Sequence, residues 1–85
     1  MPFYLYILES LKDGSYYIGC TQDLDSRIER HNEGRTKYTK GRRPWELAYS
    51  EEYPDRSSDM KREKQIKDRK SRQYIEALVR TSRQV

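Results

Sequence analysis

Two tyrosine-containing segments near the start of the chain, followed by three polar residues, have the residue types that chemistry on phosphate requires. The segments are Tyr4-Leu5-Tyr6 and Tyr17-Ile18-Gly19, and the polar residues are Arg27, His31 and Glu63. A tyrosine packs through its ring and can still donate or accept a proton through its hydroxyl. Together with an arginine, a histidine and a carboxylate, these tyrosines suit the hydrolysis of a phosphodiester bond.

Each of these residue types has a chemical task in such a hydrolysis. A divalent metal ion commonly stabilises the charge on the phosphate. Because magnesium keeps most of its waters, very few carboxylates are needed to hold it, and Glu63 alone would be enough. Arg27 can donate a forked pair of hydrogen bonds to phosphate oxygens. Tyr6 or Tyr17 can transfer a proton to or from the attacking water if a neighbouring cation lowers the pKa of its hydroxyl.

Each residue also has a structural alternative. The tyrosines can be ordinary strand core, and Arg27 can be a solvated helix residue. His31, the single histidine, can lie on a helix surface or interact with the dipole at a helix C-terminus. Glu63 can form an ion pair with Arg27, because an inward carboxylate is costly unless it is paired. Cys20, the single cysteine, excludes an internal disulfide and is expected to be a small buried filler.

Three strands are expected to position the tyrosines. Residues 3–8 form a dense apolar run, which is typical of a strand covered on both faces. The turn signal Asp13-Gly14 separates this run from a second strand over residues 15–20, so we expect an antiparallel hairpin. Residues 45–53 alternate well enough for a third strand. One face of that strand is expected to carry Trp45, Leu47 and Tyr49.

The first expected helix carries two of the candidate residues. Thr21 or Asp23 can cap its start, and Gly34 is placed to end it after about residue 33. Arg27 and His31 are one turn apart on this helix. They flank an apolar stripe that consists of Leu24 and Ile28.

Two further helices are expected after the third strand. The first begins near residues 54–55, with Asp55, Ser57 or Ser58 as its cap. Its sparse apolar stripe is Met60 and Ile66, and Glu63 falls midway, facing the sheet. The last helix begins at Ser71, and residues 81–85 are expected to be a frayed tail. Its apolar side carries Tyr74, Ile75, Leu78 and Val79.

The element order β-β-α-β-α-α predicts one α+β domain over residues 1–80, with a three-stranded antiparallel sheet flanked by helices. A chain of 85 residues leaves no room for a second domain. Only 33% of the residues are hydrophobic and 38% are charged, so disorder is the first alternative. Eight tyrosines, Trp45 and the regular apolar spacing argue for a folded chain with a thin core.

A formal net charge of +4 favours either nucleic acid or an acidic membrane surface as a partner, and for nucleic acid we expect DNA in preference to RNA. Residues 35–44 form a basic loop that either keeps this surface soluble or grips a phosphate backbone and stacks a base. The loop residues expected to bind nucleic acid are Lys37, Tyr38, Lys40, Arg42 and Arg43. Because no run reaches membrane-spanning length and residues 1–8 do not resemble a signal peptide, we expect a soluble cytoplasmic protein without a membrane partner.

The ordered set of these residues resembles the GIY-YIG nuclease superfamily. The resemblance spans roughly residues 3–70 and includes both tyrosine segments, Arg27-x-x-x-His31 and Glu63 on a later helix. Residues 37–47 (KYTKGRRPWEL) and 62–67 (REKQIK) are similar to the small standalone bacterial members of the YhbQ type. Three features differ from the wider superfamily. The first motif has Tyr4-Leu5 where others have Gly-Ile, Cys20 stands where DNA-repair relatives have lysine, and no asparagine follows Asn32.

The resemblance implies a role for each candidate residue. Tyr17 matches the tyrosine regarded as the general base, and Tyr6 matches the tyrosine that helps to position water and phosphate. Arg27 matches the arginine that steadies the phosphate, and His31 lies where relatives carry a tyrosine or histidine near the site. Glu63 matches the sole metal-binding carboxylate, normally with magnesium or manganese bound along with the substrate.

The expected function is therefore metal-dependent endonucleolytic cleavage, with branched or distorted DNA as the substrate. The substrate class follows from a small basic domain in which we identify no separate element for reading bases. One alternative is a nucleic-acid-binding module that has the same fold but no turnover. The other is an interaction protein whose basic surface meets a protein partner. For the enzyme, a protein partner could also supply the substrate specificity.

Overall fold

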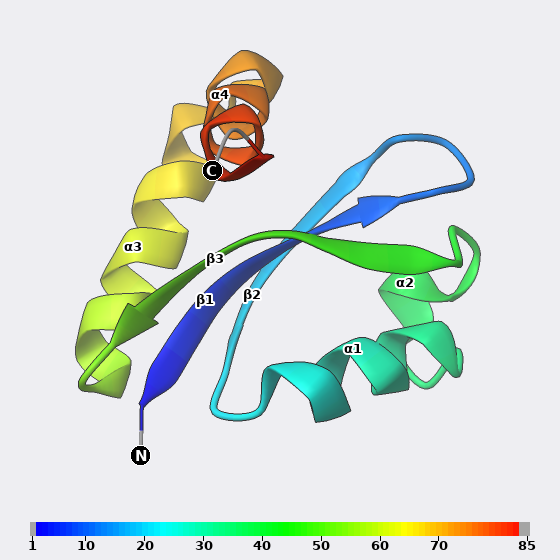
Figure 1. Ribbon diagram of the computed structural model, residues 1–85, viewed down its shortest axis with the longest axis horizontal. Helices are drawn as coiled ribbons and strands as arrows, with labels where there is room; N and C mark the ends of the chain where they lie inside the picture. The colour runs from blue at the N-terminus through cyan, green and yellow to red at the C-terminus, as the bar shows by residue number, and fades with distance from the viewer. Residues whose placement is uncertain (1, 84–85) are drawn as a thin grey trace.

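The computed structural model describes residues 2–83 and confirms the α+β class and the expected order of the main elements (Figure 1). The one addition is a short helix, α2, inside the segment that we expected to be an irregular loop. In chain order the elements are β1 (Phe3–Ser10), β2 (Tyr16–Thr21), α1 (Leu24–Asn32), α2 (Lys37–Lys40), β3 (Trp45–Tyr53), α3 (Arg56–Arg69) and α4 (Arg72–Arg83).

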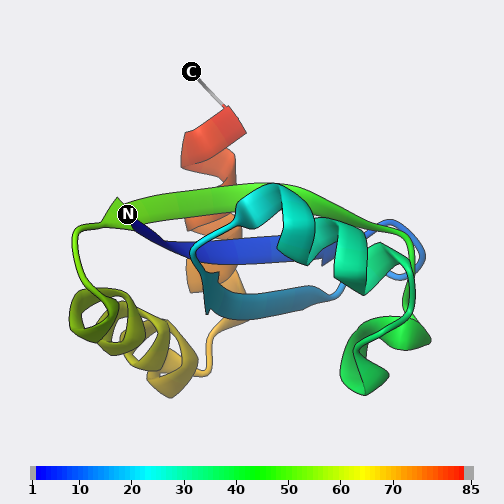
Figure 2. The same ribbon diagram turned by 90° about the horizontal axis from the view of Figure 1, so that it is seen from below.

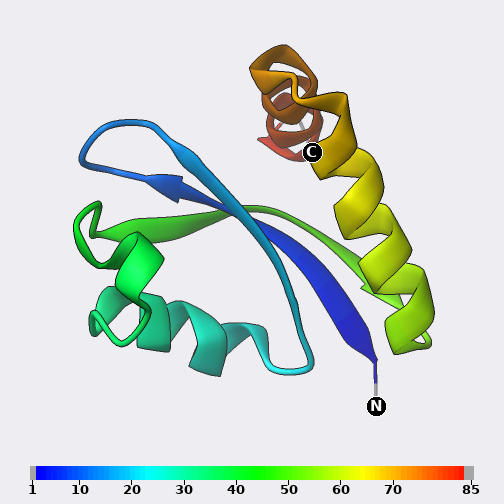
Figure 3. The same ribbon diagram turned by 180° about the vertical axis from the view of Figure 1, so that it is seen from behind.

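The three strands form one antiparallel sheet in the order β2-β1-β3. The hairpin between β1 and β2 is confirmed, and Gly14 in its connection has a φ of 77°, which favours glycine. Because β1 is central, β2 is left with one unpaired edge. Figure 3 shows β2 between α1 and α2 on one side and α3 on the other. This open edge is where the two helical layers can both contribute to a site.

Helices cover both faces of the sheet (Figure 2). Leu5 and Ile7 of β1 point toward α3 and α4, where they pack with Ile66 and other apolar residues. Tyr6 and Leu8 point the other way, toward α1. All four β1 side chains are at most 2% exposed. Burial on both faces explains the uninterrupted apolar run in the sequence.

The prediction that Trp45, Leu47 and Tyr49 share one face of β3 is wrong. Ile7 pairs with Tyr49 but Leu8 pairs with Leu47, so Ala48 is an extra residue in a β-bulge. The bulge breaks the alternation of β3. Trp45 is buried on the α1 side, whereas Ala48 and Tyr49 pack on the α3/α4 side. Leu47 is left 39% exposed.

Helix α3 begins where the sequence indicated but buries a different stripe. Asp55 is its N-cap and accepts a hydrogen bond from the Ser58 backbone N–H over 2.7 Å. Ile66 is buried as expected, but Met60 is 54% exposed, so the Met60–Ile66 stripe is wrong. The residue that the helix buries in its first turns is Asp59. Asp59, Glu63 and Ile66 follow the i, i+4, i+7 spacing of one helix face.

Helix α4 buries the side that the sequence predicted. Tyr74, Ile75, Leu78 and Val79 pack into the apolar cluster on that face of the sheet, and Ser71 caps the helix by accepting from the Tyr74 backbone N–H. The helix runs to Arg83, past the expected domain end at residue 80. The rest of the expected frayed tail, residues 84–85, lies outside the described residues. Within residues 2–83, no helix combines the length and apolar character needed to cross a membrane.

Candidate active site

Tyr6 is held against the backbone of the neighbouring strand. In the register of the hairpin it lies directly opposite Gly19. A Cβ atom at position 19 would be 2.6 Å from the Tyr6 hydroxyl oxygen and 2.7 Å from Cζ of its ring. Only glycine leaves room for a ring this close, and the Tyr6 side chain is 2% exposed as a result. The glycine of the second motif therefore has a packing function.

His31 connects Tyr6 to α2. Its Nε2 is 3.1 Å from the Tyr6 hydroxyl, and its Nδ1 is 2.8 Å from the Thr39 hydroxyl. Because the Thr39 hydroxyl donates to the Thr36 carbonyl, it accepts from His31 Nδ1–H. Nε2 is then the acceptor for the Tyr6 hydroxyl proton. His31 is 1% exposed, which contradicts the alternative of a surface histidine.

The electrostatic environment keeps this histidine neutral. Burial lowers the pKa of His31, and the positive charges of Arg27 and Arg30 lower it further. A neutral imidazole at neutral pH agrees with a ring that donates once and accepts once. The pair Tyr6–His31 is therefore a buried hydrogen-bonded unit whose proton positions are fixed by Thr39.

Helix α2 is anchored under the site, although the sequence predicted an irregular loop there. Thr39 is fully buried, and its carbonyl accepts a hydrogen bond from the Trp45 indole N–H over 2.9 Å. The Asn32 side chain brackets the Trp45 backbone, accepting from its N–H and donating to its carbonyl. Thr39 is a site residue that the sequence analysis missed. Its position inside the KYTKGRRPWEL segment could have indicated it, but we considered only the charged and aromatic residues of that segment.

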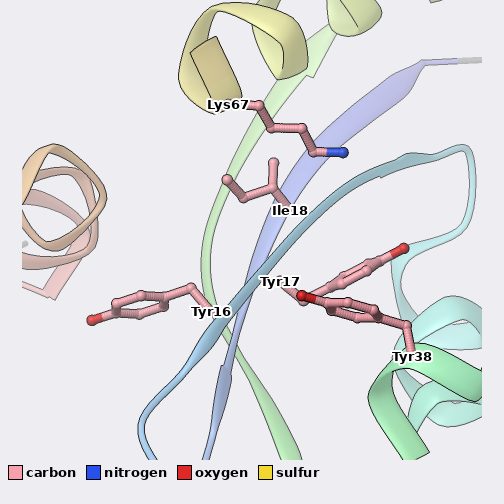
Figure 4. Close-up of a pocket in the computed structure, with 5 residues that line it drawn as sticks. All are labelled: Tyr16, Tyr17, Ile18, Tyr38 and Lys67. Carbon is pink, nitrogen blue, oxygen red and sulfur yellow. The ribbon is translucent and has the colours of Figure 1, made fainter. Parts of the chain in front are cut away.

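Tyr17 lies on the open side of this buried unit. Its ring centroid is 4.9 Å from that of His31 and 6.3 Å from that of Tyr6. On its other side, the ring of Tyr38 lies 5.8 Å away. Tyr17 also lines a cleft of about 480 Å³ along the edge of β2 (Figure 4). Of the two candidate tyrosines, Tyr17 is the one with access to a substrate.

Glu63 reaches the same edge from the opposite face of the sheet. The Cys20 thiol donates to its Oε1 over 3.0 Å, and the Lys67 ammonium donates to its Oε2 over 2.5 Å. Burial opposes ionisation, but the hydrogen bonds from Lys67 and Cys20 outweigh it and lower the pKa of Glu63. The ion pair with Lys67 replaces the alternative pair with Arg27.

Cys20 contacts the site but is not suited to act as a nucleophile. Burial, together with the carboxylates of Glu63 and Asp59, raises the pKa of its thiol. The protonated thiol instead donates a hydrogen bond to the Glu63 carboxylate. Cys20 is thus a half-buried residue that restrains Glu63, whereas the sequence predicted a fully buried filler.

Charged and polar groups on both faces of the sheet affect the pKa of the Tyr6 hydroxyl. Burial raises the pKa of the Tyr6 hydroxyl, and Tyr17, Cys20 and Glu63 add to this effect, whereas the Arg27 charge opposes it. Tyr6 and Tyr17 lie on the α1 side of the sheet and Glu63 on the α3 side. The open edge of β2 is where these groups come together.

Arg27 lies in a second cleft, of about 260 Å³, between the start of α1 and the start of α3. Arg30 and Arg56 line it as well. The sequence analysis missed these two arginines because they are more than twenty positions apart and only the fold brings them together. The other lining residues are Cys20, Thr21, Gln22, Asp23 and Ser26. A guanidinium cluster of this kind suits phosphate oxygens.

The five loop residues that we expect to bind nucleic acid lie at different places relative to the site. Tyr38 is 66% exposed and lies beside Tyr17, and the Arg42 guanidinium is 5.9 Å from the Tyr38 ring centroid. Arg43 folds back, donating to the Lys40 carbonyl over 2.9 Å. Lys37 and Lys40 have exposed side chains on α2. Tyr38 and Arg42 therefore border the site, and the other three residues lie around it.

The residues present fit one divalent cation that binds together with substrate. Within residues 2–83, no three His, Cys, Asp or Glu side chains are grouped to hold a metal ion by themselves. Glu63, however, is an ionised carboxylate whose side chain is 25% exposed. Mg²⁺ commonly binds through one or two carboxylates and substrate phosphates. Such an ion would compete with Lys67 and Cys20 for the two oxygens of Glu63.

Asp59 is buried on the same helix face as Glu63. Its side chain is fully buried, and neither carboxyl oxygen has a hydrogen-bond partner in the described part of the chain. Burial raises the pKa of this carboxyl, while Cys20 and the charge of Arg56 act in the opposite direction. A buried carboxyl without a partner costs folding free energy.

We expect Asp59→Ala to stabilise the protein by about 1–2 kcal/mol at neutral pH, because it removes an unsatisfied buried polar group. The folded-state pKa is raised, so below the unfolded-state pKa of about 3.9 the carboxyl is neutral in both states. As pH rises through the folded-state pKa, the parent loses stability that the variant keeps. Urea unfolding at pH 4 and pH 7 measures both values. An equal gain at the two pH values would show that ionisation is not the cause.

Comparison with known proteins supports the resemblance. The family described as the GIY-YIG catalytic domain matches residues 2–75. A UPF0213 protein of Staphylococcus saprophyticus is 48% identical over 65 residues, which are 75% of this chain and 78% of the relative. A UPF0213 protein of Staphylococcus aureus is 46% identical over the same shares. The solution NMR structure of a UPF0213 protein from Bacillus halodurans, 43% identical, aligns with a TM-score of 0.60 over 95% of this chain and 85% of that one.

Proposed function

Because the chain belongs to the GIY-YIG catalytic domain family and to its UPF0213 group, we propose that it is a metal-dependent endonuclease that hydrolyses phosphodiester bonds in branched or distorted DNA. One observation carries the proposal. A buried Tyr6–His31 pair adjoins Tyr17 at an open strand edge, within electrostatic reach of Arg27 and of the ionised Glu63.

The geometry favours different roles for the two tyrosines. The Tyr6 hydroxyl already donates to His31 Nε2, and burial raises its pKa, so it positions its neighbours and does not exchange protons with substrate. Tyr17 lines the open cleft, so it is the group that, with its own hydroxyl proton lost to solvent, would take the proton of the attacking water as general base. A neighbouring cation would favour this ionised form. Arg27 would donate hydrogen bonds to the phosphate oxygens.

Glu63 would hold a Mg²⁺ or Mn²⁺ ion next to the phosphate. When bound, such an ion stabilises the negative charge that develops on the phosphate oxygens. If Lys67 were displaced from Glu63, its ammonium group would be free to interact with a phosphate of the substrate.

A non-catalytic nucleic-acid-binding module is the second candidate. The observation in its favour is that both oxygens of Glu63 are engaged, one by the Cys20 thiol and one by Lys67. A metal ion must displace at least one of these donors. If no metal ion displaces either donor, nucleic acid can still bind at the cleft lined by Arg27, Arg30 and Arg56 and at the cleft lined by Tyr17 and Tyr38. A protein partner would then supply further specificity.

Cleavage of labelled branched, single-stranded and duplex DNA tests the proposal, with the parent and Tyr17→Phe compared in Mg²⁺, Mn²⁺ and EDTA. Tyr17→Phe keeps the ring that packs on His31 and Tyr38 and removes only the hydroxyl. We expect metal-dependent cleavage by the parent and a rate about 100- to 10,000-fold lower for the variant. Circular dichroism checks that both are folded.

Two outcomes would count against this mechanism. Equal cleavage by both proteins would mean that Tyr17 is not the base or that a contaminant cuts the DNA. DNA binding by the parent without any metal-dependent cleavage would favour the non-catalytic module. Salt-dependent affinity separates this second outcome from an absence of nucleic-acid binding altogether.

A further inference from the structure

The cleft along the edge of β2 has two aromatic walls and one cationic wall. It has a volume of about 480 Å³ and is lined by Tyr16, Tyr17, Ile18, Tyr38 and Lys67. Figure 4 shows the rings of Tyr17 and Tyr38 side by side on one side of β2, while Lys67 extends from α3 across Ile18. Its volume lies within the range of pockets that take small organic groups.

Tyr38 is exposed and yet firmly positioned. Its side chain is 66% exposed, the highest value among the large hydrophobic side chains that are exposed in residues 2–83. Its neighbour Thr39 is fully buried and is fixed by His31 and Trp45. The Arg42 guanidinium lies 5.9 Å from the Tyr38 ring centroid. An exposed aromatic ring on an anchored turn is suited to contact a partner with a flat surface.

The chemistry of the cleft matches one nucleotide. Stacked aromatic rings bind nucleic-acid bases through their faces, and a neighbouring ammonium group binds the phosphate. The Tyr17 ring lies between those of His31 and Tyr38, 4.9 Å and 5.8 Å away, so a base would stack on the open face of the exposed Tyr38 ring and contact Tyr17 at its edge. In a continuous duplex both faces of every base are already stacked. The cleft therefore selects a nucleotide that is unpaired.

We propose that this cleft binds one unpaired nucleotide, with its base stacked on Tyr38 beside Tyr17 and its phosphate beside Lys67. This inference rests on the proposed function, because it places that nucleotide next to the phosphate to be cleaved. It also narrows the substrate class to strands with unpaired nucleotides, such as single strands, flaps and branch points. A fully paired duplex would bind only through its phosphates.

The test is a binding experiment in EDTA, so that its result does not depend on cleavage. Two probes are compared. The first is a short single strand with a central 2-aminopurine, whose fluorescence is quenched when the base stacks, and the second is the same strand annealed to its complement. We expect the parent to quench the single strand and to bind it more tightly than the duplex. Tyr38→Ala should weaken single-strand binding about 5- to 100-fold, and Tyr38→Phe less than about 3-fold.

Lys37→Ala is the matched control on the same short helix, because it removes a charge without removing a ring. It should weaken single-strand and duplex binding by the same small factor. The proposal is overturned if Tyr38→Ala binds the single strand like the parent, or if it weakens both forms equally. It is also overturned if the parent does not quench the probe, which is the result expected if the cleft binds an apolar peptide and not a base.

The binding and cleavage experiments can refute the nucleotide cleft and the proposed enzyme separately. Quenching and a Tyr38 effect without metal-dependent cleavage would support the nucleotide cleft and refute the proposed enzyme. Cleavage of a fully paired duplex at equal rates by the parent and Tyr38→Ala would support the enzyme and refute the cleft.

Discussion

Replacing Glu63 with glutamine is expected to lower the rate of metal-dependent cleavage about 100-fold or more. Glutamine has the same shape but is neutral, so it weakens the binding of a divalent cation and removes several kcal/mol of charge stabilisation in the transition state. The fold should be nearly unchanged, because the lost ion pair with Lys67 is half exposed and such pairs contribute little. Initial rates over a Mg²⁺ titration, together with urea unfolding, measure both effects.

Glu76→Gln is the matched control for this variant. Glu76 also forms an ion pair with a residue four positions away, Arg72. This pair is on α4, and neither residue lines the two clefts at the candidate site. It should leave cleavage unchanged. If Glu63→Gln and Glu76→Gln lower the rate equally, the loss reflects general destabilisation. If neither does, Glu63 is not where the metal acts.

The layered fold could be predicted from the sequence because its signals are local. Runs of apolar residues, the turn at Asp13-Gly14 and the caps at Asp23 and Asp55 each act over a few positions, and all of them are confirmed. The pairing of β1 with β2 follows from the short connection between them. These features also place Tyr6 opposite Gly19 and bring Arg27 and His31 to one helix face.

The features that the sequence did not reveal depend on contacts between distant elements. The bulge at Ala48 arises from pairing with β1, and no local pattern in 45–53 marks it. Burial of Asp59 in place of Met60 is set by how α3 rotates against the sheet, and a helix with so few apolar residues does not define that rotation. Arg30 and Arg56 line the same cleft only because the fold brings α1 and the start of α3 to the same end of β2.

Long-range contacts also change the interpretation of residues that the sequence proposed for the site. His31 was recognised by its place in the motif, but its hydrogen bonds to Tyr6 and Thr39 require α2, which was expected to be an irregular loop. Glu63 was recognised, but its partners, Cys20 and Lys67, differ from the arginine considered for it. The sequence thus proposed these residues without indicating the partners that the structure gives them.

Gly19→Ala is the substitution for which we expect the largest loss of stability, about 1–3 kcal/mol, or roughly 5- to 150-fold in the unfolding equilibrium. Its Cβ would be 2.6 Å from the hydroxyl oxygen and 2.7 Å from Cζ of Tyr6. Tyr6 is 2% exposed and hydrogen-bonded to His31, so the ring cannot move away without breaking that bond. Urea unfolding measures the loss, and cleavage should decrease together with it.

Gly41→Ala is the matched control, because a Cβ there meets no atom within 4 Å and Gly41 has a φ of −78° that alanine adopts readily. It should leave stability within about 1 kcal/mol of the parent or raise it. Adding Tyr6→Phe to Gly19→Ala should recover only part of the loss, because the ring carbon remains too close after the hydroxyl is removed. Full recovery would assign the clash to the hydroxyl alone. No loss in Gly19→Ala would mean that Tyr6 can leave this position, and the buried Tyr6–His31 pair would then not be the fixed part of the site.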